Sequence, residues 1–138
     1  MKIYRRAKAN WKGTGMEGQG PLTTQSKILD ETQYSFKTRF EDGKGTNPEE
    51  LIAAAHAGCY TMQLSFLLTE TGYTPTNLDT KAKLLLEDGT ISKIELNLEA
   101  EIPEITNDEF QKIAKEAKEI CPVSKLLNAE ITLESTLK

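Results

Sequence analysis

The sequence predicts an α+β fold of about six strands, a long buried central helix and a second, amphipathic helix. Residues 51–68 form an apolar run with few polar side chains, which is typical of a helix buried on most sides. Segments with alternating apolar and polar residues flank this run, as expected of strands. The order strands, helix, strands, helix, strand favours an α+β plan. With 138 residues, we expect a single domain over 1–138.

The N-terminal part is expected to form three strands joined by glycine-rich turns. We predict strands over 2–11, 22–29 and 34–40, with residues 13–21 as a hairpin link. In the third strand, aromatic residues alternate with polar ones. The glycines of the link do not form a phosphate loop, because no Gly-Lys-Ser or Gly-Lys-Thr sequence follows and no apolar strand precedes them.

The central helix has strong signals at both ends. Asn47 suits the N-cap and Pro48 the first helical position. Glu49 and Glu50 place negative charge near the exposed N–H groups of the first turn. Asn47 and Glu50 also have the spacing of a capping box. Gly72 suits the C-terminal cap, so we expect the helix to end just before it.

The second half of the chain is expected to form a hairpin, two helices and a last strand. Residues 78–87 and 91–102 alternate on either side of Asp88-Gly89, a dipeptide that favours a tight hairpin turn. A one-faced amphipathic helix then begins at a capping box that starts with Thr106. It ends at Cys121-Pro122, where the proline suits the start of a short helix. The last apolar residues predict a final strand.

Composition narrows the class of protein. The net charge of −4 is modest and the basic residues are scattered, which argues against nucleic acid as a partner. The first residues lack the apolar core of a signal peptide, and polar groups and Gly58 interrupt the apolar run, so we expect neither a leader nor a membrane span. A cytoplasmic protein is then the default expectation. We also expect a homodimer, because one small chain cannot wrap the apolar helix all round.

In the cytoplasm, the two cysteines are more typically free, catalytic or redox-active than a structural bridge. A free thiol with a pKa of about 8.5 is mostly protonated at neutral pH, and burial would raise that pKa further. Cys59 lies twelve residues past Asn47, about 18 Å along the axis, where the helix dipole has faded. A reactive Cys59 therefore needs a cation, for which Arg39 is a candidate, held by Glu49 or Glu50.

Helix geometry suggests that such a site uses two chains. Glu49 and Cys59 are ten residues apart, or about 15 Å along one helix, so the carboxylate would come from a partner chain. If Cys121 approaches Cys59, the parts of a peroxide reaction are present. Cys59 would form a sulfenic acid, Cys121 would condense with it to a disulfide, and an external thiol would reduce that bond.

Other interpretations of these residues remain open. Both cysteines could be small buried hydrophobic residues of a dimeric binding module. His56 is three residues before Cys59, so a thiol- or metal-sensing site is conceivable. His56, Cys59 and Cys121 give only three good metal ligands, however, so a packed histidine is the simpler interpretation. Gly58 weakens the helix and indicates that a neighbour packs close beside Cys59.

The chain also resembles the OsmC proteins, the osmotically inducible branch of the OsmC/Ohr hydroperoxide-reductase superfamily. The resemblance rests on Gly45-Thr46-Asn47-Pro48-Glu49-Glu50-Leu51-Ile52, on Ala54-Ala55-His56-Ala57-Gly58-Cys59, on Cys121-Pro122-Val123-Ser124 and on Ala129-Glu130-Ile131-Thr132-Leu133. It implies an intertwined homodimer with two sites at the subunit interface. It also implies a thiol peroxidase of stress defence that reduces organic hydroperoxides, and hydrogen peroxide less efficiently, with no metal, haem or flavin.

The same resemblance implies a role for each site residue. By position, Cys59 matches the peroxidatic cysteine and Cys121 the resolving cysteine. Arg39 matches the arginine that polarises the thiol and the peroxide, and Glu49, rather than Glu50, matches the glutamate that orients it. The reductant is then a dithiol, for which the resemblance suggests a lipoylated protein.

Overall fold

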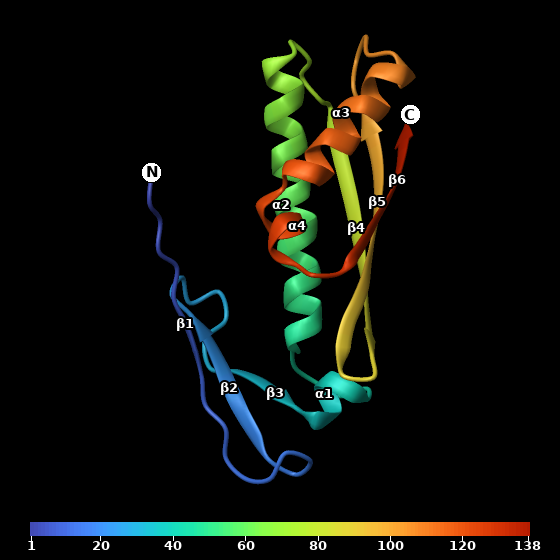
Figure 1. Ribbon diagram of the computed structural model, residues 1–138. Coiled ribbons are helices and arrows are strands. Elements are labelled where there is room, and N and C mark those ends of the chain that lie inside the picture. Colours follow the sequence, from blue (N-terminus) through green and yellow to red (C-terminus); the bar gives the residue numbers. More distant parts are fainter. The chain divides into compact units, whose positions relative to one another are not determined.

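The computed structural model describes all 138 residues of the chain, which fall into two compact units. The first unit is Met1–Leu51 and the second is Ile52–Lys138 (Figure 1). Helix α2 (Pro48–Glu70) begins in the first unit and continues through the second. Its first turn, which contains Glu49, therefore lies in the same unit as Arg39. Cys59, in the middle of the helix, lies in the second unit.

The first unit contains a three-stranded antiparallel sheet followed by a short helix. The strands are β1 (Ala7–Ala9), β2 (Gln19–Thr24) and β3 (Thr32–Ser35), and the helix is α1 (Phe36–Phe40). The predicted hairpin between the first two strands is confirmed. The first strand is shorter than the predicted 2–11. At Gly20 an added Cβ would lie 1.7 Å from the carbonyl oxygen of Asn10, so only glycine fits this close crossing.

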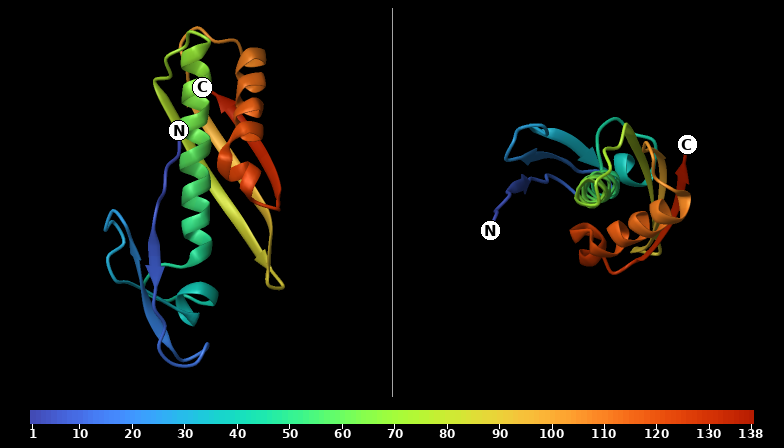
Figure 2. Two further views of the ribbon diagram at one scale, coloured as in Figure 1. Left: turned by 60° about the vertical axis from the view of Figure 1, so that its left-hand side comes forward. Right: turned by 90° about the horizontal axis from the view of Figure 1, so that it is seen from above.

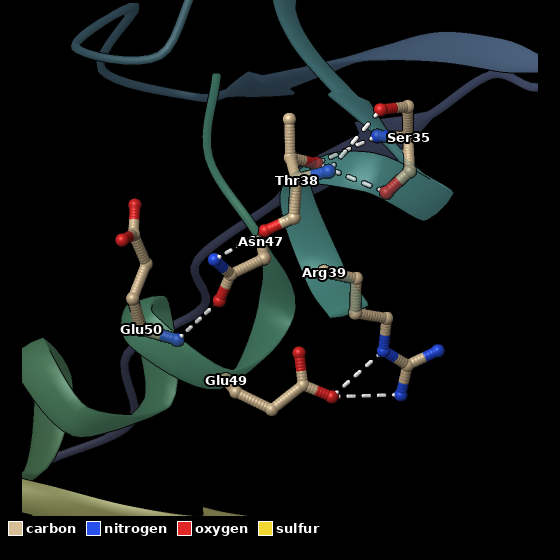
Figure 3. Close-up of polar contacts among 6 residues, drawn as sticks. All are labelled: Ser35, Thr38, Arg39, Asn47, Glu49 and Glu50. Carbon is tan, nitrogen blue, oxygen red and sulfur yellow. Dashed lines mark hydrogen bonds and ion pairs between the residues drawn. The ribbon is translucent and has the colours of Figure 1, made fainter. Parts of the chain in front are cut away.

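The predicted strand over 34–40 is wrong beyond Ser35, where the chain turns into α1. Ser35 is the N-cap, and its side chain accepts from the N–H of Thr38. Thr38 returns the bond by accepting from the N–H of Ser35 at 2.8 Å (Figure 3). This reciprocal capping box satisfies two backbone donors and fixes the helix start. Over five residues, alternation of aromatic and polar side chains does not separate a strand from one helical turn.

The second unit packs helices against a mixed three-stranded sheet. Its remaining elements are β4 (Asn77–Glu87), β5 (Thr90–Glu101), α3 (Asn107–Ile120), α4 (Pro122–Leu126) and β6 (Glu130–Leu137). The predicted hairpin turn is confirmed, since Asp88 and Gly89 have φ values of +50° and +76°. Strand β6 runs parallel to β5, at the edge opposite β4.

Helices α2 and α3 cover the same face of this sheet, as the view from above shows (Figure 2). The core contains side chains of α2, β5 and α3, namely Tyr60, Leu64, Leu68, Ile94, Leu96, Leu98, Ala100, Phe110, Ile113, Ala114 and Ala117. The buried residues of β5 alternate, which confirms the alternation predicted for residues 91–102. Cys121 is part of the same core, so one of the two thiols is fixed in packed surroundings.

Within one chain, α2 buries a single stripe rather than most of its surface. Its buried side chains recur every fourth residue, at His56, Tyr60, Leu64 and Leu68. On its other side Met62 and Phe66 are 63% and 58% exposed. By length and composition alone α2 could cross a membrane, although the core helix of a soluble protein passes the same test. The chain therefore leaves an apolar helix face uncovered.

Candidate active site

The first unit holds the predicted ion pair between Arg39 and Glu49 (Figure 3). Both Nε and Nη2 of Arg39 lie 2.8 Å from Oε1 of Glu49. The Arg39 side chain is 43% exposed, whereas that of Glu49 is 13% exposed. The guanidinium carbon lies 5.1 Å from the ring centre of Phe40. The pair therefore fixes one edge of the guanidinium and leaves its other donors free to bind an anion or an oxygen.

The start of α2 explains why Arg39 pairs with Glu49 and not with Glu50. Oδ1 of Asn47 accepts from the N–H of Glu50 at 2.7 Å, which confirms the predicted cap (Figure 3). The Glu50 carboxylate does not reach back to the Asn47 backbone but accepts from the hydroxyl of Thr46 at 2.8 Å. The predicted box is thus half formed, and Glu50 is already engaged.

A second contact of the cap residue positions α1 against the first turn of α2. The side-chain amide of Asn47 donates to the carbonyl of Thr38 at 2.9 Å. The chain between them turns at Gly45, where φ is +131° and an added Cβ would lie 2.4 Å from the carbonyl oxygen of Gln33. Since Arg39 follows Thr38 directly, these contacts hold its backbone at a fixed place beside Glu49.

The second unit brings the two cysteines together. Cys59 lies in the middle of α2 and is partly exposed, whereas Cys121 is the N-cap of α4 and is fully buried. Both are free thiols, Cys59 packs against the buried core that contains Cys121, and Cys121 is among the groups that raise the pKa of Cys59. They are 62 positions apart in the sequence, so their approach comes from packing of the α3–α4 turn against α2. Cys59 and Cys121 therefore lie near each other within one chain, and their catalytic roles stay predictions.

The surroundings of Cys59 disfavour its thiolate. Burial is the largest influence and raises the pKa of Cys59, because it penalises the charged form. The contact with Cys121 raises this pKa further, whereas the backbone N–H of Val123 donates to the sulfur and lowers it. The net shift is upward, and no cationic side chain contributes to it. Cys59 is therefore protonated at neutral pH unless a cation is brought to it.

His56 contacts neither thiol by a hydrogen bond but binds Ser124. Its Nε2 lies 2.7 Å from Oγ of Ser124, and its Nδ1 is buried without a partner. Burial lowers the pKa of His56, so the ring is neutral at physiological pH. No group of three or more His, Cys, Asp or Glu side chains is placed to hold a metal ion. Sequence reasoning assigned no role to Ser124 or Val123, although both lie in the Cys-Pro-Val-Ser run.

Comparison with known proteins assigns the chain to a family. A family profile described as "OsmC-like protein" matches residues 41–136. The chain belongs to the OsmC family. It is 46% identical over 142 residues to the Peroxiredoxin OsmC of Escherichia coli (strain K12), covering 100% of this chain and 99% of that one. It is 31% identical over 128 residues to an organic hydroperoxide resistance protein-like chain of Staphylococcus aureus (strain MSSA476), covering 89% and 90%.

Solved structures of more distant proteins share the fold of this OsmC-family chain. An organic hydroperoxide resistance protein from Elizabethkingia anophelis matches with a TM-score of 0.75 at 23% identity, covering 100% of this chain and 99% of that one. The OhrB protein of Bacillus subtilis matches with a TM-score of 0.68 at 22% identity, covering 99% and 98%. The α+β fold and the resemblance to the OsmC/Ohr superfamily are therefore confirmed.

The surroundings of Gly58 in this OsmC-family chain differ from the prediction. Nothing within one chain lies within 4 Å of a Cβ built on Gly58, so the neighbour expected beside it is not supplied by the same chain. A groove of about 680 Å³ instead runs from Gly58 and Met62 on α2 to the start of β4. Neither cysteine lines this groove, so the groove is not the site of the two thiols.

Proposed function

We propose that this OsmC-family protein is a cysteine-based thiol peroxidase that reduces organic hydroperoxides, and hydrogen peroxide less efficiently, in defence against oxidative and osmotic stress. The observation that carries the proposal is that Cys59, a partly exposed free thiol, packs against the core that contains the buried free thiol of Cys121. Such a pair is suited to forming a sulfenic acid and then a disulfide. The names of the similar proteins, a peroxiredoxin and a hydroperoxide resistance protein, agree with this chemistry.

The proposed cycle has three balanced steps. The Cys59 thiolate attacks the outer oxygen of the hydroperoxide, the O–O bond breaks, and the alkoxide takes a proton and leaves as the alcohol. The Cys121 sulfur then attacks the sulfenic sulfur of Cys59, forming the disulfide and releasing water. Finally, an external dithiol reduces the disulfide by exchange and is itself oxidised. We propose a lipoylated protein as that dithiol and the cytoplasm as the compartment.

Arg39 is proposed to supply the cation that Cys59 lacks, with Glu49 orienting it. The fork of Arg39 has free donors that can stabilise both the thiolate and a peroxide oxygen. Its partner Glu49, however, is ten residues from Cys59 on the unbroken helix α2, about 15 Å along the axis. We therefore propose that each Cys59 is served by Arg39 of the partner subunit.

The exposed face of α2 supports an intertwined homodimer. Ala55, Gly58, Met62 and Phe66 are exposed at a spacing of three and four residues, which places them in one stripe. Large exposed apolar side chains in a row are typical of a surface that binds another protein. Gly58 in this stripe has open space above it, so a second helix could approach closely. We propose that a second copy of the chain covers this stripe and that both units act as one domain.

Mass measurement tests the chemistry directly. Reduced protein treated with one equivalent of an alkyl hydroperoxide is expected to lose two hydrogen atoms per chain, as a Cys59–Cys121 disulfide forms. Cys121→Ser is expected to gain one oxygen atom instead, because the sulfenic acid has no partner. Cys59→Ser should show neither change. Equal consumption of the hydroperoxide by wild type and Cys59→Ser would overturn the proposal.

A further inference from the structure

A partly buried hydrogen bond joins the two segments that carry the thiols. His56 Nε2 and Ser124 Oγ are 2.7 Å apart, although the residues are separated by 68 positions. His56 is fully buried and lies one turn before Cys59 on α2. Ser124 lies in α4, three residues after Cys121. The bond therefore connects the helix that bears one thiol to the turn that bears the other.

Beyond its N-cap Cys121, which is buried in the core, helix α4 has few other means of holding its position. It is five residues long, none of its residues is fully buried, and its N-cap Cys121 makes no side-chain capping bond. Helices this short are not stable on their own in water, so their placement depends on tertiary contacts. Val123 and Leu127 pack partly against the core, and the backbone N–H of Val123 lowers the pKa of Cys59. Beside these contacts, the bond to His56 is a direct polar link from α4 to α2.

The chemistry of His56 suits it to positioning rather than to proton transfer with Cys59. Its Nδ1 is buried without a partner, so a charged ring would leave a buried N–H unsatisfied. Placing the single proton on Nε2, where it is donated to Ser124, leaves only a bare lone pair on Nδ1, which costs less than an orphaned donor. His56 makes no hydrogen bond to Cys59, so it acts on the thiols through Ser124.

We propose that His56 and Ser124 form a clamp that keeps Cys121 against Cys59 and so sets the rate of disulfide closure. This inference rests on the proposed two-step chemistry. In closure, the S–S bond forms at about 2.05 Å, so the two sulfurs must approach each other to bonding distance. A misplacement of about 1 Å can slow such a step about 100-fold. His56 and Ser124 are thus positioning residues for the second step, not for attack on the peroxide.

Rapid-mixing kinetics can separate the two steps. Reduced protein is mixed with excess alkyl hydroperoxide, quenched with a cyclic dione that traps sulfenic acid, and analysed by mass. Attack depends on the peroxide concentration, whereas closure does not. For Ser124→Ala we expect closure to slow about tenfold or more, with attack slowed less than about threefold. Ser124→Thr, which keeps the hydroxyl, should restore closure. In a His56→Phe background, adding Ser124→Ala should have little further effect.

Tyr73→Phe is the matched control. It removes another hydrogen bond between distant side chains, that of Tyr73 to Glu109 at 2.6 Å. Glu109 lies twelve residues before Cys121, about 18 Å along α3, so closure should keep its wild-type rate in this variant. Equal closure rates in Ser124→Ala and wild type would overturn the clamp, as would equal slowing by Tyr73→Phe. If the wild-type chain formed no Cys59 sulfenic acid, the proposed function would fail first, and the clamp with it.

Discussion

The two units of this chain hold complementary halves of the proposed chemistry. The first unit has an exposed guanidinium, held on one edge by a largely buried carboxylate, but contains no thiol. The second unit has two neighbouring free thiols, but the pKa of Cys59 is raised by burial and no cation lowers it. The first unit therefore offers a cation without a thiol, and the second offers a thiol whose pKa no cation lowers.

This difference shows what each half needs from the other. A buried thiol is stable as a neutral group, and it becomes reactive only when a cation offsets the cost of desolvating the thiolate. An arginine kept partly exposed by an ion pair can supply that charge without changing its own protonation. If the guanidinium and the thiol of one site come from different chains, the peroxidase would become reactive only after assembly with a second copy.

The largest expected effect comes from removing the charge of the first unit. Arg39→Ala should lower the second-order rate of Cys59 oxidation at pH 7 by about 100-fold, because the thiolate and the departing oxygen both lose a donor. Arg39→Lys should recover only part of this rate, since lysine lacks the fork. Burial raises the pKa of Cys59, and in Arg39→Ala no cation offsets this rise. The oxidation rate of the variant should therefore increase over a higher pH range than that of wild type. A wild-type pH profile in Arg39→Ala would remove Arg39 from the mechanism.

A smaller effect is expected from loosening the ion pair while keeping the arginine. Glu49→Gln should lower the same rate about tenfold, because Arg39 is no longer held by a carboxylate. Glu50→Gln is the matched control, since Glu50 binds Thr46 and does not contact Arg39. Stopped-flow oxidation of both variants checks the prediction. Equal rates in the two variants would show that orientation by Glu49 is unimportant.

The apolar surface of α2 leads to a prediction about the substrate. If apolar side chains near Cys59 line the assembled site, each buried methylene of the hydroperoxide contributes about 0.8 kcal/mol, or about fourfold in rate. An alkyl hydroperoxide should then react about tenfold or more faster than hydrogen peroxide at equal concentration. Initial rates with excess dithiol measure this ratio, and a ratio near one would argue against an apolar pocket.

The smallest expected effect concerns stability in the second unit. Burial lowers the pKa of His56 from its ordinary 6.5, so the unfolded chain takes up a proton at higher pH than the folded chain. The stability due to neutral His56 is present above about pH 6.5 and is lost as the pH falls below it. His56→Gln should therefore show a weaker fall in the free energy of unfolding between pH 7.5 and 5.5. Urea titrations at the two pH values measure this free energy, and an equal fall in wild type and His56→Gln would contradict the prediction.

Sequence reasoning succeeded where local signals decide the structure. The Asn47-Pro48 cap, the Asp88-Gly89 turn and the Thr106 cap each fix one element boundary through nearby backbone bonds, and all three are present. The residues after Ser35 were predicted wrongly because one helical turn is too short to show its period. Local signals thus placed most of the fold.

Contacts between distant residues were harder to foresee. Helix geometry could exclude contact between Glu49 and Cys59 along α2, but it could not choose between Glu49 and Glu50 as the partner of Arg39, which the packing of α1 decides. Nothing local indicates that His56 binds a side chain 68 positions away. Such contacts depend on how α4 packs on α2, which no short window of sequence encodes.

Mixed dimers test the central proposal, that Arg39 of one subunit activates Cys59 of the other. Chains with Arg39→Ala and chains with Cys59→Ser, given different tags and co-expressed, would be purified as the mixed dimer and compared with each parent. The mixed dimer contains one site with both Arg39 and Cys59, so we predict about half of the wild-type activity per dimer. A mixed dimer no more active than the better parent would contradict a site shared between subunits.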